Sequence, residues 1–273
     1  MAVGVSQAFF ILLILDFFCI SISFDLKFFT CRKQRSLPML LSKSTNEEIG
    51  KLKVLGVCGG IGSGKSSACK LLVSSLGCVA HLDADSIAHS VYSPGTQAVK
   101  DVVAEFGTKI LQDGTDDTID RKKLGPIVFA DRSKMAKLEE IVWPHVKDSI
   151  KLKIDDLQST WAEEGESDKG SNEPIIILEA AILLDAGWDD LMDGVWAVVA
   201  TKEIALERIM ARNNLSREEA EKRIIAQESR RGIGNLEEEK EKGKITAIIE
   251  NNGTLDDLKE ALQNTLSDPK SWN

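Results

Sequence analysis

Gly59-Gly60-Ile61-Gly62-Ser63-Gly64-Lys65-Ser66 matches the phosphate-binding pattern G-x-x-x-x-G-K-[ST] at every defined position. The loop follows a short apolar run, residues 53–58, which predicts a buried strand, and leads into an apolar-periodic segment through Leu76, which predicts a helix. Glycines let backbone N–H groups curl around phosphate oxygens, and a helix N-terminus adds favourable potential for anions. A glycine-rich turn without a ligand is the alternative, but the strand-to-helix context favours binding of ATP or GTP.

The residue types within this loop predict individual roles. We expect Lys65 to reach the β and γ phosphates and the Ser66 hydroxyl to ligate Mg²⁺. The loop residues expected to line the nucleotide are Gly60, Ile61, Gly62, Ser63, Gly64, Lys65, Ser66 and Ser67.

Two carboxylates, Asp83 and Asp85, follow a second short apolar run, residues 78–82. Ligands of open parallel sheets lie beyond the carboxyl ends of the strands, so we expect this pair to face the loop. One carboxylate could accept a proton from an attacking hydroxyl while the other supports Mg²⁺ or substrate. The alternative is that the pair caps a helix beginning near Ser86. The neighbouring loop favours the catalytic interpretation.

Alternating strands and helices predict an α/β fold with a five-stranded parallel doubly wound sheet. Further buried strands are expected at residues 174–178, 195–200 and 245–249. Glu179, directly after one of them, could support Mg²⁺ or simply cap the strand end.

Helical segments complete the expected organisation. Periodicity over residues 96–106, 121–129 and 134–161 predicts a helical insertion, at about 90–162, for the acceptor. Two later helices predict a lid at about 208–235 that closes over ATP and excludes water, and it carries Arg208, Arg212, Arg230 and Arg231. A solvated charged helix face is the alternative, and it suits Arg217, Glu221 and Lys222 better than Arg212.

Length, net charge and cysteine content limit the class of protein to which this chain can belong. The chain has 273 residues, a formal net charge of −9 and a pI near 5.1. An acidic balance argues against a protein that coats nucleic acid or anionic membranes, and the length allows a full core without disulfides or metal. The cysteines are odd in number and lack C-x-x-C pairing, so they indicate neither a disulfide framework nor a zinc site; they are Cys19, Cys31, Cys58, Cys69 and Cys78.

The first 50 residues differ from the rest. Residues 8–24 form an apolar run at the short edge of what spans a bilayer, interrupted by Asp16, and positive charges follow at residues 27–35. This order predicts a membrane tether that holds the catalytic domain in the cytosol; an organelle-targeting presequence and a wrongly predicted first exon are the alternatives. Residues 36–50 are expected to be a linker, with the folded domain at 51–273.

An ordered series of motifs makes residues 51–266 resemble the dephospho-CoA kinase family. The motifs are the loop of residues 59–66, Asp83 to Ala88, Pro94-Gly95, Phe106-Gly107, Asp117 to Leu124, Val128-Phe129, Leu138-Glu139, Trp143-Pro144, residues 177–188, Arg208, Arg212, residues 216–227 and 251–253. The resemblance implies transfer of the ATP γ-phosphoryl group to the ribose 3′-hydroxyl of dephospho-CoA, the last step of coenzyme A synthesis.

The resemblance also implies roles for single residues. Asp85 matches the proposed general base, Arg212 matches the lid arginine that neutralises charge on the transferred group, and Asn251 lies in the segment near the adenine. Asp83, Arg121 and Arg208 are expected at the substrate; an intradomain salt bridge is the alternative for Arg121.

Three departures separate this chain from the common bacterial pattern. His89 replaces an arginine, Trp143 replaces a histidine, and residues 181–185 replace a P-L-L-F-E run. The Trp143-Pro144 pair and the L-L-acid-A-G-W string at residues 183–188 are instead similar to the kinase domain of eukaryotic bifunctional CoA synthase, yet no adenylyltransferase domain fits into the first fifty residues. The sequence therefore predicts a monofunctional kinase of the eukaryotic type, in which His145 could substitute for the missing histidine or lie on a surface helix.

The sequence is also compatible with two other functions. The loop, the carboxylate pair and the lid are also features of P-loop kinases that act on nucleoside monophosphates or small metabolites. A membrane-tethered nucleotide-binding protein without catalysis is the non-enzyme alternative. Retention of Lys65, Ser66, Asp85 and Arg212 speaks against it. The sequence does not predict the oligomeric state.

Overall fold

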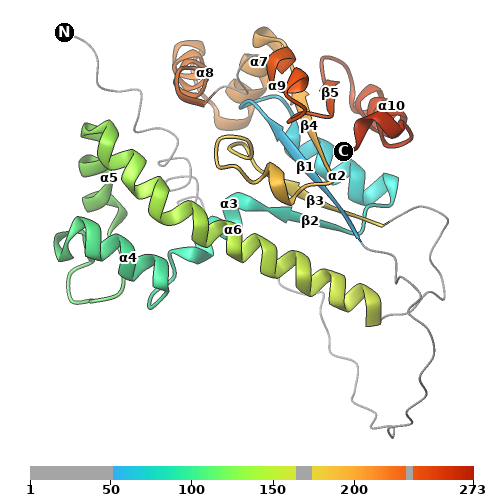
Figure 1. Ribbon diagram of the computed structural model, residues 1–273. Helices are drawn as coiled ribbons and strands as arrows, with labels where there is room; N and C mark the ends of the chain where they lie inside the picture. The colour runs from blue at the N-terminus through green and yellow to red at the C-terminus, as the bar shows by residue number, and fades with distance from the viewer. Residues whose placement is uncertain (1–51, 164–173, 232–235) are drawn as a thin grey trace, which may run out of the picture.

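A computed structural model describes residues 52–163, 174–231 and 236–273. In these residues five parallel strands form one sheet in the order β2-β3-β1-β4-β5 (Figure 1). The strands are β1 (Lys53–Gly59), β2 (Ala80–Asp83), β3 (Ile175–Glu179), β4 (Gly194–Val199) and β5 (Ala247–Glu250). The predicted five-stranded parallel sheet is thereby confirmed.

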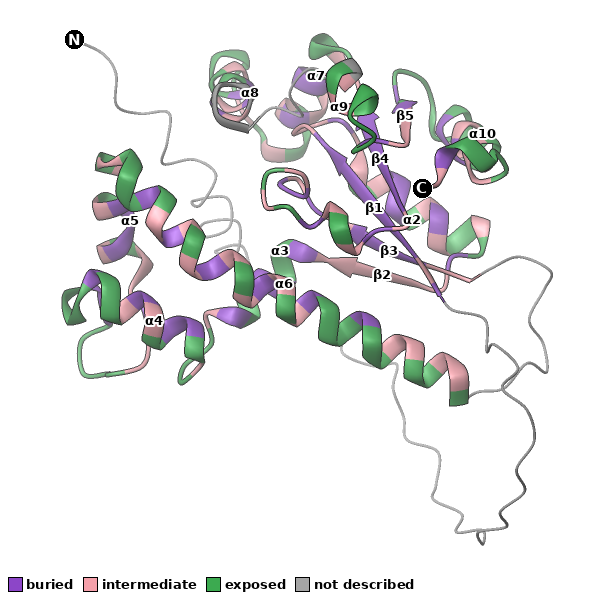
Figure 2. Cartoon of the chain, viewed as in Figure 1, coloured by how far each residue is buried: buried purple, intermediate pink, exposed green. Residues whose placement is uncertain are grey.

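Helices cover both faces of the sheet, and the central strands are therefore buried on both sides (Figure 2). One face packs against α2 (Lys65–Leu76) and α10 (Leu255–Leu266) through a core that includes Leu55, Ile177 and Trp196. The other face packs against α3 (Ala84–Val91) and α6 (Arg132–Glu163) through the neighbouring strand positions. This is the doubly wound arrangement that the alternating pattern predicts.

Strand β2 begins two residues later than the apolar run suggested. Gly77 ends α2 in a left-handed conformation with φ 81°, and the Cys78 amide donates to the Leu72 carbonyl of that helix. The Val79 amide then donates to the Ile175 carbonyl of β3. Because Cys78 still completes the helix terminus, regular strand pairing starts at Ala80 and extends through Asp83.

The middle of the chain contributes three helices and one short 3-10 turn: α4 (Gln97–Phe106), η1 (Thr108–Ile110), α5 (Arg121–Ala130) and α6. Helix α6 is one continuous helix of 32 residues, with Pro144 inside it. Its buried side chains recur every three or four residues, so one buried stripe runs from residue 135 to residue 154; they are Met135, Leu138, Val142, Val146, Ile150 and Ile154. In Figure 1 α6 connects the sheet to the part that holds α4 and α5.

The remaining elements are η2 (Asp189–Leu191), α7 (Lys202–Asn213), α8 (Arg217–Arg231), α9 (Leu236–Glu241) and η3 (Pro269–Ser271). Asn214, at φ 50°, ends α7 and reverses the chain into α8. A small core of its own, centred on Leu206, Ile209 and Ile224, joins these two helices. Figure 1 places α7 and α8 beside the carboxyl end of β1.

No helix among the described residues is both long and apolar enough to cross a membrane. The expected tether at residues 8–24 lies outside those residues.

Candidate active site

The phosphate-binding loop runs from the end of β1 into α2, and its glycines are required by the close packing around it. Gly64 has φ 97°, and a Cβ atom there would collide with the side-chain amide of Asn251. A Cβ atom on Gly62 would lie 2.7 Å from the carbonyl oxygen of Ala205. Only glycine lets the loop pass this close to its neighbours while leaving backbone N–H groups for a phosphate.

Lys65, the first residue of α2, lies partly buried at the centre of the site. Its Nζ donates to the Gly60 carbonyl oxygen at a long 3.4 Å. Burial lowers the pKa of Lys65, while the negative charges of Glu179 and Asp85 favour the ammonium form. The side chain is therefore held near two carboxylates by one weak hydrogen bond, which leaves it able to turn toward a phosphate.

Ser66 and Glu179 connect the loop to the end of β3. The Ser66 hydroxyl donates to Glu179 Oε1 at 2.6 Å, and His81 Nε2 lies 3.0 Å from Glu179 Oε2. Burial raises the pKa of Glu179, but the hydrogen bonds from His81 and Ser66 and the charge of Lys65 bring it below its usual value. Glu179 is thus a carboxylate at neutral pH, next to the hydroxyl expected to ligate Mg²⁺.

Asp83 and Asp85 have different surroundings. Asp83 pairs in register with Glu179 and caps α3, since its oxygens accept hydrogen bonds from the Asp85 amide at 3.0 Å and the Ser86 hydroxyl at 2.8 Å. The helix starts at Ala84 rather than near Ser86, because Asp83 supplies the cap. Desolvation and repulsion from Asp83 raise the pKa of Asp85 to about 6, although Lys65 opposes the shift. The capping interpretation therefore holds for Asp83, while Asp85 interacts with Lys65.

Arg208 and Asn251 brace the loop from behind. Arg208 Nη1 donates to the Ser63 carbonyl at 3.3 Å and to the Gly62 carbonyl at 3.5 Å. Asn251 Nδ2 donates to the same Ser63 carbonyl at 2.8 Å, and its Oδ1 lies 3.4 Å from Arg208 Nη2. The structure thus brings both predicted residues to the loop, where they bind its carbonyl oxygens.

Helices α7 and α8 also approach the loop. Arg212 Nε donates to Asn213 Oδ1 at 3.2 Å, and desolvation followed by the positive charge of Arg223 lowers the pKa of Arg212. Gln227 accepts a hydrogen bond from the Ile61 amide of the loop. Sequence reasoning missed Gln227, because nothing in a polar helical segment shows which face meets the loop.

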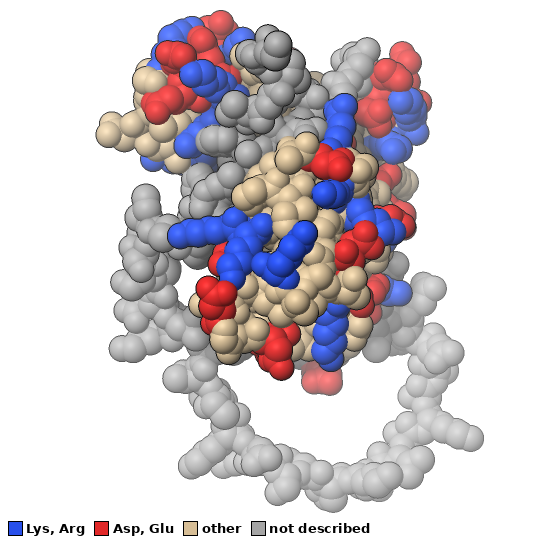
Figure 3. All heavy atoms as spheres, turned by 90° about the vertical axis from the view of Figure 1, so that its left-hand side faces the viewer, with Lys and Arg blue, Asp and Glu red and all other residues tan. Residues whose placement is uncertain are grey.

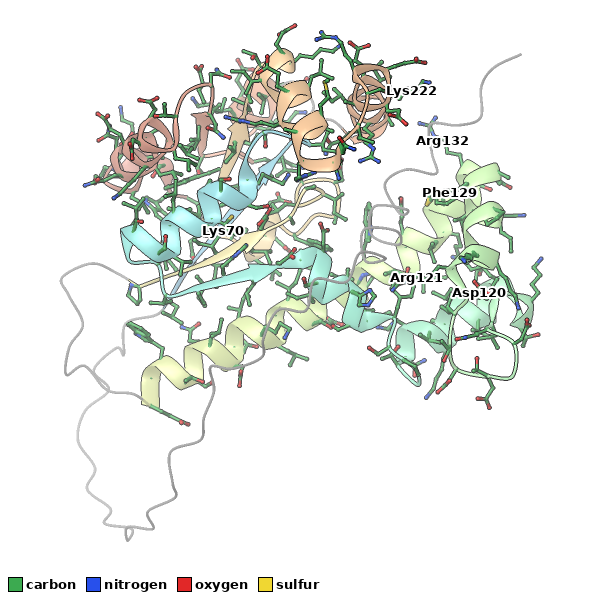
Figure 4. The ribbon with its side chains drawn as sticks, turned by 180° about the vertical axis from the view of Figure 1, so that it is seen from behind. Lys70, Asp120, Arg121, Phe129, Arg132 and Lys222 are labelled. Atoms are coloured by element: carbon green, nitrogen blue, oxygen red, sulfur yellow. The ribbon has the colours of Figure 1, made fainter. Side chains whose placement is uncertain are left out.

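Arg121, the first residue of α5, belongs to a second group of side chains. Its Nη2 lies 2.8 Å from His89 Nδ1 on α3, and its guanidinium lies 5.9 Å from the centre of the Tyr92 ring. Figure 4 shows Arg121 on the side of its helix that faces α3, with Asp120 farther out. Seen from the side where α4 and α5 lie, several Lys and Arg side chains gather on a largely uncharged surface (Figure 3).

His145, the residue considered as a substitute for the missing histidine, is engaged elsewhere. Its Nε2 lies 2.8 Å from Asp101 of α4, so it links α4 to α6.

The site combines a strand–loop–helix unit, whose loop ends in the lysine and serine of the G-x-x-x-x-G-K-[ST] pattern, with carboxylates at the carboxyl edge of a parallel sheet. This combination defines a P-loop kinase. Comparison with known proteins narrows this class. The family model described as dephospho-CoA kinase matches residues 53–257, and the chain belongs to the dephospho-CoA kinase family.

Relatives and solved structures agree with this assignment. The dephospho-CoA kinase of Geobacter sulfurreducens is 38% identical over 212 residues, which cover 78% of this chain and 96% of the relative. That of Lactobacillus johnsonii is 35% identical over 214 residues, with the same coverage. A crystal structure from Thermus thermophilus matches with a TM-score of 0.55 and 30% identity over 79% of this chain and 97% of its own. The dephospho-CoA kinase from Campylobacter jejuni matches with a TM-score of 0.50 and 25% identity, covering 78% and 94%.

Proposed function

We propose that this enzyme transfers the γ-phosphoryl group of ATP to the ribose 3′-hydroxyl of dephospho-CoA, using side chains at the carboxyl edge of its sheet. One observation carries the proposal. In a member of the dephospho-CoA kinase family, Lys65, Ser66, Glu179 and Asp85 lie around one phosphate-binding loop. Neither a nucleoside monophosphate kinase nor a protein without catalysis is favoured by any contact of this site.

Mg²⁺ fits the residues present. The Ser66 hydroxyl and the Glu179 carboxylate already lie 2.6 Å apart, and hydroxyl, carboxylate and phosphate oxygens are the ligands that Mg²⁺ prefers. Ser66 would hold the ion directly, and Glu179 would orient the hydroxyl or a bound water. When bound, the ion neutralises charge on the β and γ phosphates.

Asp85 supplies the base in this proposal. The acceptor oxygen forms a bond to the γ phosphorus, its proton passes to a carboxylate oxygen of Asp85, and the bond between the γ phosphorus and the bridging oxygen breaks to release ADP. A carboxylate with a pKa near 6 is ionised at neutral pH and holds a proton better than an ordinary aspartate.

Positive charge for the transferred group comes from Lys65 and the lid. Lys65 turns from the Gly60 carbonyl to the phosphates, and Arg212 neutralises charge that spreads over the γ-phosphoryl oxygens. Arg208 and Asn251 hold the loop carbonyls, so that the backbone N–H groups are aimed before the nucleotide binds. In this proposal the lid at about 208–235 closes over ATP and excludes water. Residues 232–235 and the side chains of Arg230 and Arg231 lie outside the part of the chain that the structure describes.

The acceptor binds to the helical insertion at about 90–162. Arg121, held over Tyr92 by its hydrogen bond to His89, would contact an acceptor phosphate. Asp83 ends β2, two residues before the proposed base in the first turn of α3. The proposed kinase domain, which includes this insertion and the lid, comprises residues 51–273.

We also propose that residues 8–24 tether the enzyme and leave the kinase domain in the cytosol, because positive charges follow the apolar run. Fractionation of cells that express the full chain or a chain beginning at residue 51 tests this. The tether proposal fails if both chains remain in the supernatant.

The kinase assay uses the full chain with ATP, Mg²⁺ and dephospho-CoA, and follows ADP release by a coupled reaction. ADP release should require dephospho-CoA, and the product should carry a phosphate at the 3′ position by phosphorus NMR. A panel of nucleoside monophosphates serves as the control. Faster turnover of any of these than of dephospho-CoA would overturn the proposal.

A further inference from the structure

Three side chains of metal-binding types lie together beneath the phosphate-binding loop: Cys69 of α2, His81 of β2 and Glu179 of β3. One ligand atom from each, the sulfur, a ring nitrogen and a carboxylate oxygen, lies within 4.8 Å of each of the others. His81 Nε2 and Glu179 Oε2 are already 3.0 Å apart. We call these residues the Cys69 cluster.

The register of the sheet brings the cluster together. His81 pairs with Ile177, and Asp83 pairs with Glu179, so these residues share one face of β2 and β3. Ile177 packs in the core beside Ala68 and Leu72, and this face is therefore the one that α2 covers. Cys69 follows Ala68 on α2, and Figure 4 labels Lys70, the next residue, on the same helix.

The donor set suits a particular kind of ion. Thiolate, imidazole and carboxylate are the protein ligands of Zn²⁺, which accepts three such ligands and a water, whereas Mg²⁺ prefers oxygen alone. The His81 side chain is 25% exposed and that of Glu179 12%, while Cys69 is fully buried. An ion can therefore arrive on the His81 side and meet the sulfur last.

We propose that the Cys69 cluster binds a thiophilic divalent cation, with Zn²⁺ the best match, and that the bound ion inhibits phosphoryl transfer. Binding forms one bond each to sulfur, nitrogen and oxygen, and the thiol proton of Cys69 is released to solvent. Inhibition, which rests on the proposed function, follows from the double use of Glu179. Its Oε1 accepts a hydrogen bond from the Ser66 hydroxyl, which is the proposed ligand of Mg²⁺. An ion bound to Glu179 in the cluster therefore pulls the carboxylate away from Ser66.

The binding test uses Co²⁺ as a spectroscopic substitute for Zn²⁺ on the metal-free full chain. We expect one equivalent to bind, with an intense near-ultraviolet thiolate-to-cobalt band that Zn²⁺ removes by displacement. Cys69→Ala should lose the band and weaken binding by at least about 100-fold. Cys78→Ala is the matched control, since Cys78 is also a buried cysteine but lies outside the cluster, and it should keep the band.

A second variant covers the event that Cys69→Ala does not fold. His81→Gln removes the nitrogen ligand from a side chain that is not in the core, and it should weaken Co²⁺ binding while the protein stays folded. Wild-type protein without a thiolate band, or a Cys69→Ala variant that binds Co²⁺ as tightly as wild type, would refute the site.

The inhibition test measures ADP release at fixed Mg²⁺ with increasing Zn²⁺. Wild type and Cys78→Ala should lose activity as the site fills, and Cys69→Ala should remain active at those Zn²⁺ concentrations. Binding without inhibition overturns the second half of the proposal. Because cobalt binding is read without substrate, a chain that binds the metal but phosphorylates nothing contradicts the proposed function and leaves the site intact.

Discussion

Replacement of Asp85 by asparagine removes the proposed base and keeps the shape of the side chain. Asp85 lies in the first turn of α3, where its carboxylate interacts with Lys65 and is repelled by Asp83 and Glu179. An amide cannot accept the proton of the attacking hydroxyl, but it leaves the loop and Lys65 in place. We therefore expect ATP to bind while phosphoryl transfer is lost.

The expected loss of rate follows from the role of Asp85 as the base, and the expected pH dependence follows from its pKa. Loss of a general base costs about 10²–10⁴-fold in rate, or about 3–5 kcal/mol in the activation free energy. With the pKa of Asp85 near 6, about 97% of the groups are ionised at pH 7.5 and about 9% at pH 5. The kcat/KM of wild type should thus fall about tenfold between these pH values, because protonation removes the base.

The assay is the coupled ADP measurement across this pH range, with ATP binding followed separately by calorimetry. Asp83→Asn is the matched control, since asparagine also caps helices, and removal of the neighbouring charge should move the acidic limb to lower pH. Wild-type turnover by Asp85→Asn, or an acidic limb that persists unchanged in it, would refute the assignment of Asp85 as the base.

Three further predictions test the metal ligands, the loop and the core. Glu179→Gln should raise the Mg²⁺ concentration for half-maximal activity by about 10–100-fold, because it weakens the support of the ligating hydroxyl; a magnesium titration that matches wild type would contradict this. Gly64→Ala should abolish ATP binding by calorimetry, since its Cβ meets Asn251, whereas Gly77→Ala, with a similar φ and open space around it, should bind ATP normally. Leu178→Ala should lower the free energy of unfolding in urea by about 2–5 kcal/mol, because that side chain is fully buried in the core on the sheet face that α3 and α6 cover, and a loss below about 1 kcal/mol would mean that the core closes over the cavity.

Much of the fold could be predicted because local patterns agree with the tertiary arrangement. The runs at residues 53–58 and 195–200 are apolar at nearly every position, as strands buried on both faces require, and they become β1 and β4. The strand predicted at residues 78–82 begins only at Ala80, because Gly77 and Cys78 complete the C-terminal end of α2. A run of hydrophobic residues indicates that the segment is buried, but it does not show whether the segment ends a helix or forms a strand.

The chain sequence by itself determined the phosphate-binding loop, the order of strands and helices, and the family, because each depends on residue types at short, fixed spacing. Only the tertiary structure decided which distant residues meet. Gln227 reaches the Ile61 amide, Arg208 and Asn251 bind the loop carbonyls, and His81 meets Cys69 and Glu179. The physical reason is that such contacts are set by sheet register and helix packing, which bring together side chains whose separation along the chain carries no signal.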